Sequence, residues 1–298
     1  MDGSERMTLP NFIVIGQMKA GTSSLNNYLS EHPDIFTPTA LKETRFFNLD
    51  FEDPQRPSHV KPGLPVTIEQ YCALFSEAGN QSAIGEVSPQ YLESPYAARQ
   101  ISAHLPQVRI IASLRNPVDR LYSLYQMEVR NRRESRPFLT AFRTGKAYPW
   151  VKNAFVHQHL LRYFEQFRAD AIHVLLFERL VREPGAVMAE TYDFLGVDCA
   201  FQGDYGQVHN KGGLPKSQMV FQFGRLLTQS PSMKQTLKDW LPDGLINAGR
   251  RVRDGNLEKA PALDAEARAE VAADYREDVM KVQDLTGLDL GPWWPDFA

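Results

Sequence analysis

The sequence predicts an α/β fold in which a parallel β-sheet carries helices on both faces, within a single domain. Short apolar segments rich in β-branched residues alternate along the chain with segments of helical periodicity. The first apolar segment leads directly into a glycine-containing turn and then into a helix. The chain has 298 residues, 43% of them hydrophobic, which is enough to form one large core.

Four segments are expected to form the strands because they are short and apolar: Phe12–Ile15, Ser82–Val87, Val108–Leu114 and Ile172–Phe177. Helices are expected at Thr22–Ser30, Ile68–Phe75, Tyr96–His104, Pro117 to about Arg132, Ala154–Phe167, Ala186–Leu195 and Ala265–Leu285. Asn116 and Asp264 are expected to cap two of these helices. The proline-rich segment Asp50–Pro65 is expected to be a loop. Residues 1–10 are expected to be a flexible N-terminus before a domain at 11–298.

Composition and charge argue against several classes of protein. A net charge of −3 gives no reason to expect a nucleic-acid partner. Cys72 and Cys199 lie far apart in the sequence, so neither a disulfide framework nor a zinc site is expected. The first ten residues lack the basic-then-apolar pattern of a signal peptide, and no apolar run approaches the ~18 residues of a membrane span. We therefore expect a soluble, cytoplasmic protein, with no prediction for its oligomeric state.

The most informative segment is Phe12–Leu25, which reads FIVIGQMKAGTSSL. A turn between a strand and a helix directs backbone N–H groups and the helix N-terminus at one point, where an anion such as phosphate binds. The spacing of Gly16 and Gly21 matches the Gly-x-x-x-x-Gly-Lys-Ser/Thr loop that binds nucleoside triphosphates. However, Thr22 stands where that loop has its lysine, and the lysine of this chain comes earlier, at Lys19. The displaced lysine indicates a phosphate-containing ligand other than ATP.

Two motifs together resemble those of a known enzyme family. KAGTSSL (Lys19–Leu25) and LRNPVDRLYSLY (Leu114–Tyr125) are similar to motifs of the sulfotransferases that use 3′-phosphoadenosine-5′-phosphosulfate (PAPS). Further matches are KETRFF (Lys42–Phe47), GEVSPQYL (Gly85–Leu92), HNKGGLPKS (His209–Ser217) and the segment from Asp274 to Trp293. The likeness is strongest to the carbohydrate, heparan-type branch and its bacterial relatives. It implies a P-loop-type sulfotransferase fold, with PAPS as co-substrate, 3′-phosphoadenosine-5′-phosphate (PAP) as product and no metal.

The resemblance also implies which residues hold PAPS. The 5′-phosphosulfate would be bound by Lys19 and by donors on Ala20, Gly21, Thr22, Ser23 and Ser24. Arg115 and Ser123 are eight positions apart, about two helical turns, so both can face one groove. By resemblance they bind the 3′-phosphate, which arginine recognises through paired hydrogen bonds. A loop that contains Lys211, Gly212 and Gly213 would close over the nucleotide.

Three residues are candidates for catalysis. Lys19 can reach the bridging oxygen between phosphorus and sulfur, where negative charge develops. Glu86 is the predicted general base, because a carboxylate at the end of a strand can take the proton of a hydroxyl or amine acceptor and the matching glutamate does so in the heparan-type branch. By resemblance, Lys42 is a second cation that stabilises the transferring group or holds Glu86. The acceptor is expected to be a sugar, a lipid or a small molecule, in a pocket shaped by Asp50–Pro65 and Met219–Ala260.

Two other functions remain open at this stage. An ATP-dependent kinase of the P-loop class would place Glu86 at the end of a Walker-B-like strand. The absence of Gly-Lys-Ser/Thr and the presence of the Arg115 and Ser123 pair argue against it. A non-catalytic nucleotide-binding protein would bind the nucleotide without transfer to any acceptor.

Overall fold

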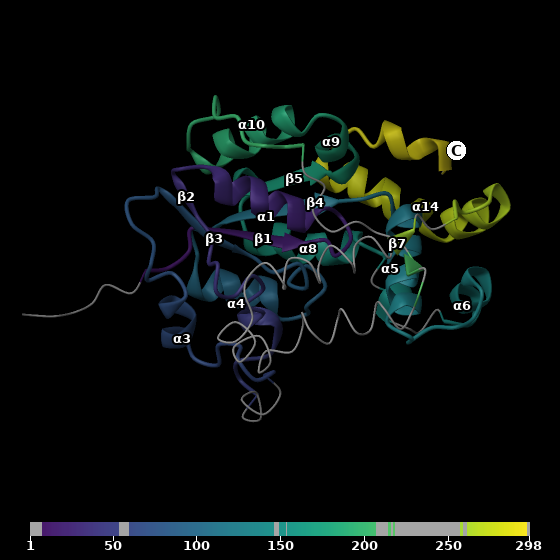
Figure 1. The fold of residues 1–298 in the computed structure, drawn as a ribbon, viewed down its shortest axis with the longest axis horizontal. Coiled ribbons are helices and arrows are strands. Elements are labelled where there is room, and N and C mark those ends of the chain that lie inside the picture. Colours follow the sequence, from purple (N-terminus) through teal and green to yellow (C-terminus); the bar gives the residue numbers. More distant parts are fainter. Residues whose placement is uncertain are drawn as a thin grey trace, which may run out of the picture. The chain divides into compact units, whose positions relative to one another are not determined.

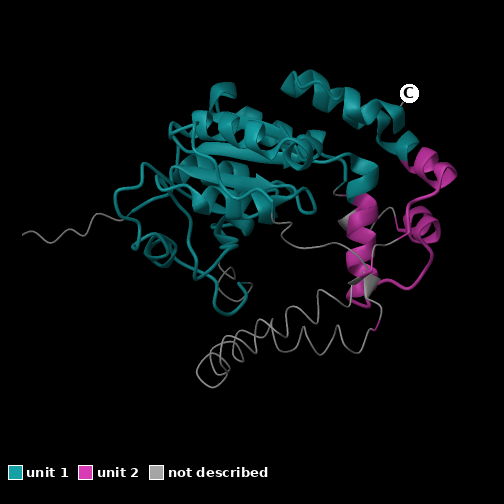
Figure 2. Ribbon diagram, turned by 45° about the horizontal axis from the view of Figure 1, so that its top comes forward, with its two compact units in different colours: residues 1–120, 153–209, 272–298 teal, residues 121–152, 210–271 magenta. Residues whose placement is uncertain are grey.

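The structure is a computed structural model that describes residues 8–53, 60–145, 149–152, 154–206, 214–215, 217, 257–258 and 261–296. The chain divides into two compact units (Figure 2). Unit 1 consists of residues 1–120, 153–209 and 272–298, and unit 2 of residues 121–152 and 210–271. The expectation of a single domain at 11–298 stays a prediction.

Unit 1 is built on a five-stranded sheet in which every neighbouring pair is parallel (Figure 1). Its strands are β1 (Phe12–Gly16), β2 (Ile35–Phe36), β3 (Ala83–Val87), β4 (Arg109–Leu114) and β5 (Ile172–Leu176), in the order β2-β3-β1-β4-β5. The predicted α/β fold is therefore confirmed. The two-residue edge strand β2 was not predicted, because two residues are too few to show the alternation of a strand.

The helices of unit 1 follow the sequence expectation closely. They are α1 (Thr22–Glu31), α3 (Ile68–Ala73), α4 (Ala97–His104), α8 (His157–Gln166), α9 (Phe177–Arg182) and α10 (Pro184–Leu195), with short 3₁₀ turns at Phe46–Asn48, Ala169–Ala171 and Gly291–Asp296. Phe177 was expected to end a strand but begins α9 instead. Helix α8 begins at His157 rather than at Ala154. At its start, the backbone N–H groups of Val156 and His157 donate to the Asp278 carboxylate.

Two helices cross the boundary between the units. Helix α5 (Pro117–Arg130) begins in unit 1, and α14 (Ala265–Thr286) ends there. Both predicted caps are present: Asn116 Oδ1 accepts the N–H of Val118 at 2.9 Å, and Asp264 Oδ1 accepts that of Ala267 at 2.8 Å. Unit 2 also contains α6 (Phe138–Thr144), α7 (Pro149–Lys152) and an antiparallel pair, β6 (Leu214–Pro215) with β7 (Leu257–Glu258).

Helices cover both faces of the sheet. Helices α1, α9 and α10 lie on one face, and α4 and α8 pack together on the other (Figure 1). The core on the first face combines buried residues of the strands with those of the three helices: Phe12, Val14, Leu25, Tyr28, Leu29, Ile111, Leu175, Leu180, Val187, Met188, Tyr192 and Leu195. Burial of this apolar surface fixes the strands in register, so the carboxyl ends of β3, β1 and β4 lie side by side. Ligands of such sheets bind beyond this edge.

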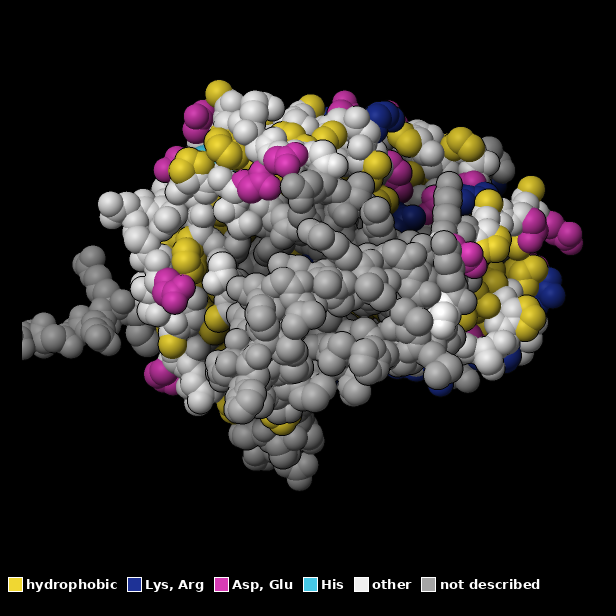
Figure 3. Space-filling view, in the orientation of Figure 1, with side chains coloured by type: hydrophobic (Ala, Val, Ile, Leu, Met, Phe, Trp, Pro, Cys, Tyr) yellow, Lys and Arg dark blue, Asp and Glu magenta, His cyan; other side chains and the backbone are white. Residues whose placement is uncertain are grey.

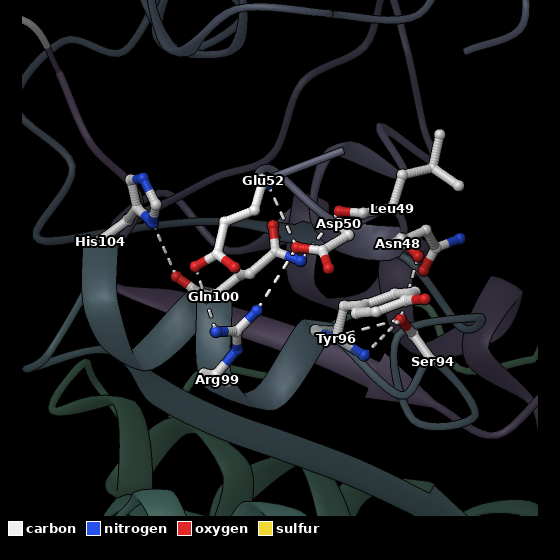
Figure 4. Close-up of polar contacts among 10 residues, drawn as sticks. Asn48, Leu49, Asp50, Glu52, Ser94, Tyr96, Arg99, Gln100 and His104 are labelled. Carbon is white, nitrogen blue, oxygen red and sulfur yellow. Dashed lines mark hydrogen bonds and ion pairs between the residues drawn. The ribbon is translucent and has the colours of Figure 1, made fainter. Parts of the chain in front are cut away.

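The loop that begins at Asp50 is anchored to α4 (Figure 4). Arg99 forms ion pairs with Asp50 and Glu52, at 3.3 and 3.4 Å. Gln100 donates from its side-chain amide to the carbonyl of Leu49 at 2.8 Å. The described residues at the start of the expected loop Asp50–Pro65 are thus held in place by polar contacts, and residues 54–59 lie outside the described part of the chain.

Charges on the visible surface are mixed. On the described part of the face in Figure 3, acidic and basic side chains are interspersed among apolar ones and do not gather into one large basic patch. This distribution agrees with the near-neutral net charge of −3. It gives no support for a nucleic-acid surface on that part of the molecule.

Candidate active site

The turn between β1 and α1 leaves a helix N-terminus open. Gly21 is the N-cap of α1 with φ +77°, a left-handed conformation that favours glycine, and no side chain caps the helix. A Cβ atom at Gly21 would lie 2.8 Å from Cδ2 of Phe177, so a larger residue would also collide with α9. The first N–H groups of a helix need partners from outside it. An anion can provide them here, as the sequence predicted.

The end of β4 holds this turn in place. Gln17 donates its N–H to the carbonyl of Ser113 at 2.8 Å, and the Ser113 hydroxyl donates to the carbonyl of Ala20 at 2.6 Å. Ala20 donates its own N–H to the carbonyl of Gln17 at 3.3 Å. The N–H of Ala20 therefore forms a hydrogen bond within the turn, whereas it was predicted from the sequence to donate to the ligand. The remaining predicted donors come from Gly21 onward.

Two arginines bind carbonyl groups of the same turn. Arg115 donates from Nη1 to the carbonyl of Lys19 at 3.0 Å, and its guanidinium lies 4.7 Å from the centre of the Phe177 ring. Arg120 is buried, donates from Nε to the carbonyl of Met18 at 3.1 Å, and pairs with Glu93. Arg115 thus lies beside this turn (residues 16–24, the anion turn), and Arg120 supports it from within the protein, while the role of Arg115 on the 3′-phosphate stays a prediction.

Lys42 reaches the anion turn from another segment. Its Nζ donates to the Ser23 hydroxyl at 2.7 Å, so residues 19 positions apart in the sequence meet at the N-terminus of α1. Burial lowers the pKa of Lys42, with the nearby Glu43 carboxylate opposing the shift. The prediction that Lys42 serves as a second cation is consistent with this position. Lys19 is half-buried within the turn, with φ +70°.

Glu86 belongs to β3 and is 0% exposed. Each carboxyl oxygen has two hydroxyl contacts. Oε1 lies 2.8 Å from the Tyr71 hydroxyl and 2.9 Å from that of Tyr91, and Oε2 lies 2.6 Å from that of Thr44 and 2.7 Å from that of Ser88. Burial raises the pKa of Glu86, and these four hydrogen bonds partly offset the shift. The sequence placed this carboxylate at an accessible strand end, whereas the fold buries it. Its assignment as general base stays a prediction.

Glu43, the residue after Lys42, was not predicted as a site residue from the sequence. Its side chain is 29% exposed, and its Oε2 accepts hydrogen bonds from Arg45 at 2.9 Å and from Gln90 at 3.3 Å. Oε1 has no hydrogen-bond partner among the described residues. A glutamate next to a predicted catalytic lysine in the KETRFF motif was a signal available in the sequence.

Four predicted site residues are not brought to the turn by the described geometry. Ser123 belongs to unit 2, whereas Arg115 belongs to unit 1, so their pairing on a 3′-phosphate stays a prediction. Lys211, Gly212 and Gly213 lie outside the described residues.

Of the hydroxyl residues at the start of α1, Thr22 is buried and Ser24 is half-buried.

The family model described as "Sulfotransferase family" matches residues 10–201, which include the anion turn, Lys42, Glu86 and Arg115. The chain belongs to the sulfotransferase family. This sulfotransferase is similar to a crystal structure of a sulfotransferase from Alicyclobacillus acidocaldarius, with a TM-score of 0.69 and 27% identity over 96% of this chain and 99% of that chain. It also shares the fold of the sulfotransferase domain from the curacin biosynthetic pathway, with a TM-score of 0.51 and 16% identity over 89% of this chain and 97% of that one.

Two longer proteins share parts of the sequence. The membrane-associated sulfotransferase kil1 of Dictyostelium discoideum is 36% identical over 141 residues, which are 46% of this chain and 27% of that protein. Human bifunctional heparan sulfate N-deacetylase/N-sulfotransferase 2 is 27% identical over 207 residues, 63% of this chain and 22% of that protein. The match therefore spans only about a quarter of each relative's length. Within the described residues of this sulfotransferase, no helix has the length and apolar character needed to cross a membrane.

Proposed function

We propose that this sulfotransferase moves the sulfuryl group of PAPS to a hydroxyl or amine of a sugar, lipid or small-molecule acceptor. The acceptor atom attacks sulfur, the bond from sulfur to the phosphate oxygen breaks, and PAP leaves with the electron pair. The acceptor's proton passes to a carboxylate. As in phosphoryl transfer, catalysis rests mainly on positioning and on stabilisation of charge.

One observation carries this proposal: an uncapped helix N-terminus, a lysine and an arginine meet at the carboxyl edge of the sheet. The N-terminus of α1 offers N–H donors, Lys42 contacts Ser23 there, and Arg115 contacts the carbonyl of Lys19. Such a group of fixed positive charges and donors suits a phosphosulfate, whose charge moves onto the bridging oxygen as the bond to sulfur breaks. Lysine and arginine supply this charge without any need for a metal.

The test is an acceptor screen with sulfur-labelled PAPS in the presence of a chelator. Amino sugars come first, because the names of the heparan-related proteins specify N-sulfotransfer; neutral sugars, lipids and phenols follow. Transfer of label to any acceptor supports the proposal. Turnover that needs ATP and magnesium instead would favour the kinase. Binding of PAP without transfer would favour a nucleotide-binding protein. The expected cytoplasmic location stays a prediction.

The proton acceptor is a choice between two carboxylates, and we favour Glu43. Glu86, the candidate from the sequence, is buried under four hydroxyl groups. A general base must approach its proton within hydrogen-bond distance. Glu43 is partly exposed, lies next to Lys42 in the chain and has one oxygen without a partner among the described residues.

Glu43→Gln is expected to lower kcat by roughly 10²–10⁴, the usual contribution of a general base, while PAP binding is preserved. The matched control is Glu86→Gln, measured for the same acceptor at saturating PAPS. If Glu43→Gln keeps full activity and Glu86→Gln loses it, the base is Glu86.

A further inference from the structure

The hydroxyl groups around Glu86 take part in more short oxygen–oxygen contacts than they have hydrogens to donate. Besides the four contacts with the carboxyl group, the Thr44 and Tyr91 hydroxyl oxygens lie 2.8 Å apart, which makes five short oxygen–oxygen contacts. Each hydroxyl has one hydrogen to donate, so Thr44, Tyr71, Ser88 and Tyr91 supply four. If Glu86 were ionised, one of these contacts would bring lone pairs together with no hydrogen between them.

A proton on the Glu86 carboxyl group supplies the fifth hydrogen. The carboxyl O–H can donate to the Thr44 hydroxyl, which donates to Tyr91, which in turn donates to the other carboxyl oxygen. Tyr71 and Ser88 donate as before, and every contact then contains one hydrogen. Because burial raises the pKa of both tyrosines well above the usual range, neither is a source of negative charge in the cluster.

The surroundings also favour the neutral form. Glu86 is fully buried, and no ion pair of the described residues includes it. An ionised carboxylate without a cation is costly in a protein interior, whereas a neutral carboxyl group with all its hydrogen bonds made is tolerated. Burial shifts the pKa of Glu86 in the same direction.

The cluster fixes the backbone of the neighbouring segment. The N–H groups of Arg45, Phe46 and Phe47 donate to the hydroxyls of Ser88, Thr44 and Tyr91, at 3.3, 3.3 and 3.4 Å. Three consecutive residues are thus bonded to three of the four hydroxyls that surround Glu86. Lys42 and Glu43 come immediately before this segment, and Lys42 reaches the anion turn.

We propose that Glu86 keeps its proton at neutral pH and is a positioning residue, whose hydroxyl cluster sets the place of Lys42 and Glu43 beside the anion turn. The catalytic part of this inference rests on the proposed sulfuryl transfer. The protonation state and the order of segment 42–47 do not, so they are measured without turnover.

The first test is spectroscopic. An infrared difference spectrum of the wild type minus Glu86→Gln at neutral pH should contain the C=O stretch of a protonated, hydrogen-bonded carboxylic acid. A carboxylate band in its place overturns the proposal. The measurement needs no acceptor, so it stands even if the acceptor screen finds no transfer.

The second test compares Thr44→Val with Thr44→Ser, which differ in whether the hydroxyl is kept. Thr44→Val should speed amide hydrogen exchange at Phe46, whose N–H donates to the Thr44 hydroxyl, by about tenfold, the effect of one lost buried hydrogen bond. Thr44→Ser should restore the protection. Unchanged exchange in Thr44→Val would overturn the positioning role.

The third test uses activity. Glu86→Gln mimics the neutral acid, because its carboxamide can accept from both tyrosines and donate to Thr44 and Ser88. It should keep kcat within about tenfold of wild type, against the roughly 10²–10⁴ lost with a general base. Glu86→Leu removes every polar partner, and we expect it to lose activity together with exchange protection at residues 45–47. A large loss of kcat in Glu86→Gln with normal exchange protection would identify Glu86 as the base and overturn the proposal.

Discussion

The anion turn at residues 16–24 and the segment 42–47 border the same proposed site, but they are held by different chemistry. The turn is held through its carbonyl groups, by Arg115, Arg120 and the hydroxyl of Ser113. The segment 42–47 is held through its N–H groups, by hydroxyls that surround a buried carboxyl group. Arginine keeps its charge at every pH the protein meets. The turn therefore depends mainly on permanent charges, and the segment next to Glu43 depends on hydrogen bonds to hydroxyl groups.

The largest expected effect is on stability and comes from removing Arg120, which holds the anion turn. Arg120→Met removes the buried guanidinium that pairs with Glu93, whose side chain is only 14% exposed, and that donates to the carbonyl of Met18. The variant should lose about 3–5 kcal/mol of the free energy of unfolding, as other broken buried pairs do. Chemical denaturation measures it.

The control is Arg168→Met, which breaks the exposed pair between Arg168 and Asp170. Exposed pairs contribute little to stability, so this variant should stay close to wild type. Equal losses in the two variants would show that the burial of Arg120 has no special part in holding the turn.

The next effect is on acid stability, near the same arginine. Neither ring nitrogen of His159 on α8 has a hydrogen-bond partner in the described part of the chain, and burial, with the charges of Arg162 and Arg120, lowers its pKa from 6.5 to about 4. Between pH 6.5 and 4 the unfolded chain therefore binds a proton that the folded chain does not. The folded state should lose up to about 3 kcal/mol as pH falls through this window.

Thermal unfolding from pH 7 to pH 4 measures this loss. In His159→Phe, the free energy of unfolding should differ less between pH 7 and pH 4 than in the wild type, because the contribution of this histidine is removed. An unchanged pH dependence in the variant would remove His159 as its cause.

The smallest expected effect concerns recognition. Arg115→Ala should lower the preference for PAP over the nucleotide without a 3′-phosphate by about tenfold to a hundredfold, the value of a charge-assisted hydrogen bond. Arg115→Lys keeps the charge but cannot form paired hydrogen bonds, so its preference for PAP should lie between those of the wild type and Arg115→Ala. Calorimetric titration with both nucleotides measures the ratio. If Arg115→Ala keeps the wild-type ratio, another residue recognises the 3′-phosphate.

Much of the fold was predictable because its signals are local. The apolar run Phe12–Ile15, the glycine spacing and the Asn116-Pro117 cap each lie within a few residues, and all three appear in the structure as predicted. The start of α8 was missed because its first turn bonds to Asp278, which is 122 positions from Val156. Helix α9 was missed because its six residues are too few to show a helical period.

The candidate site was predictable only in part. The sequence named Lys42 and Arg115 as site residues, and in the structure both contact the anion turn, while their roles stay predictions. It did not show that Glu86 is buried and Glu43 is partly exposed, because these properties depend on side chains from distant segments. Tyr71 lies 15 positions from Glu86, and Thr44 lies 42 positions from it.

The sequence by itself determined the class of fold, the family and the turn that suits an anion, since each is written in short patterns of residue type and spacing. Only the tertiary structure decided that Glu86 is buried, that Glu43 is partly exposed, and what holds the segment 42–47 in place. The physical reason is solvation. A carboxyl group is a base at a surface and a neutral hydrogen-bonding partner in an interior, and the packing of α3, β3 and the segment 42–47 places Glu86 in the interior.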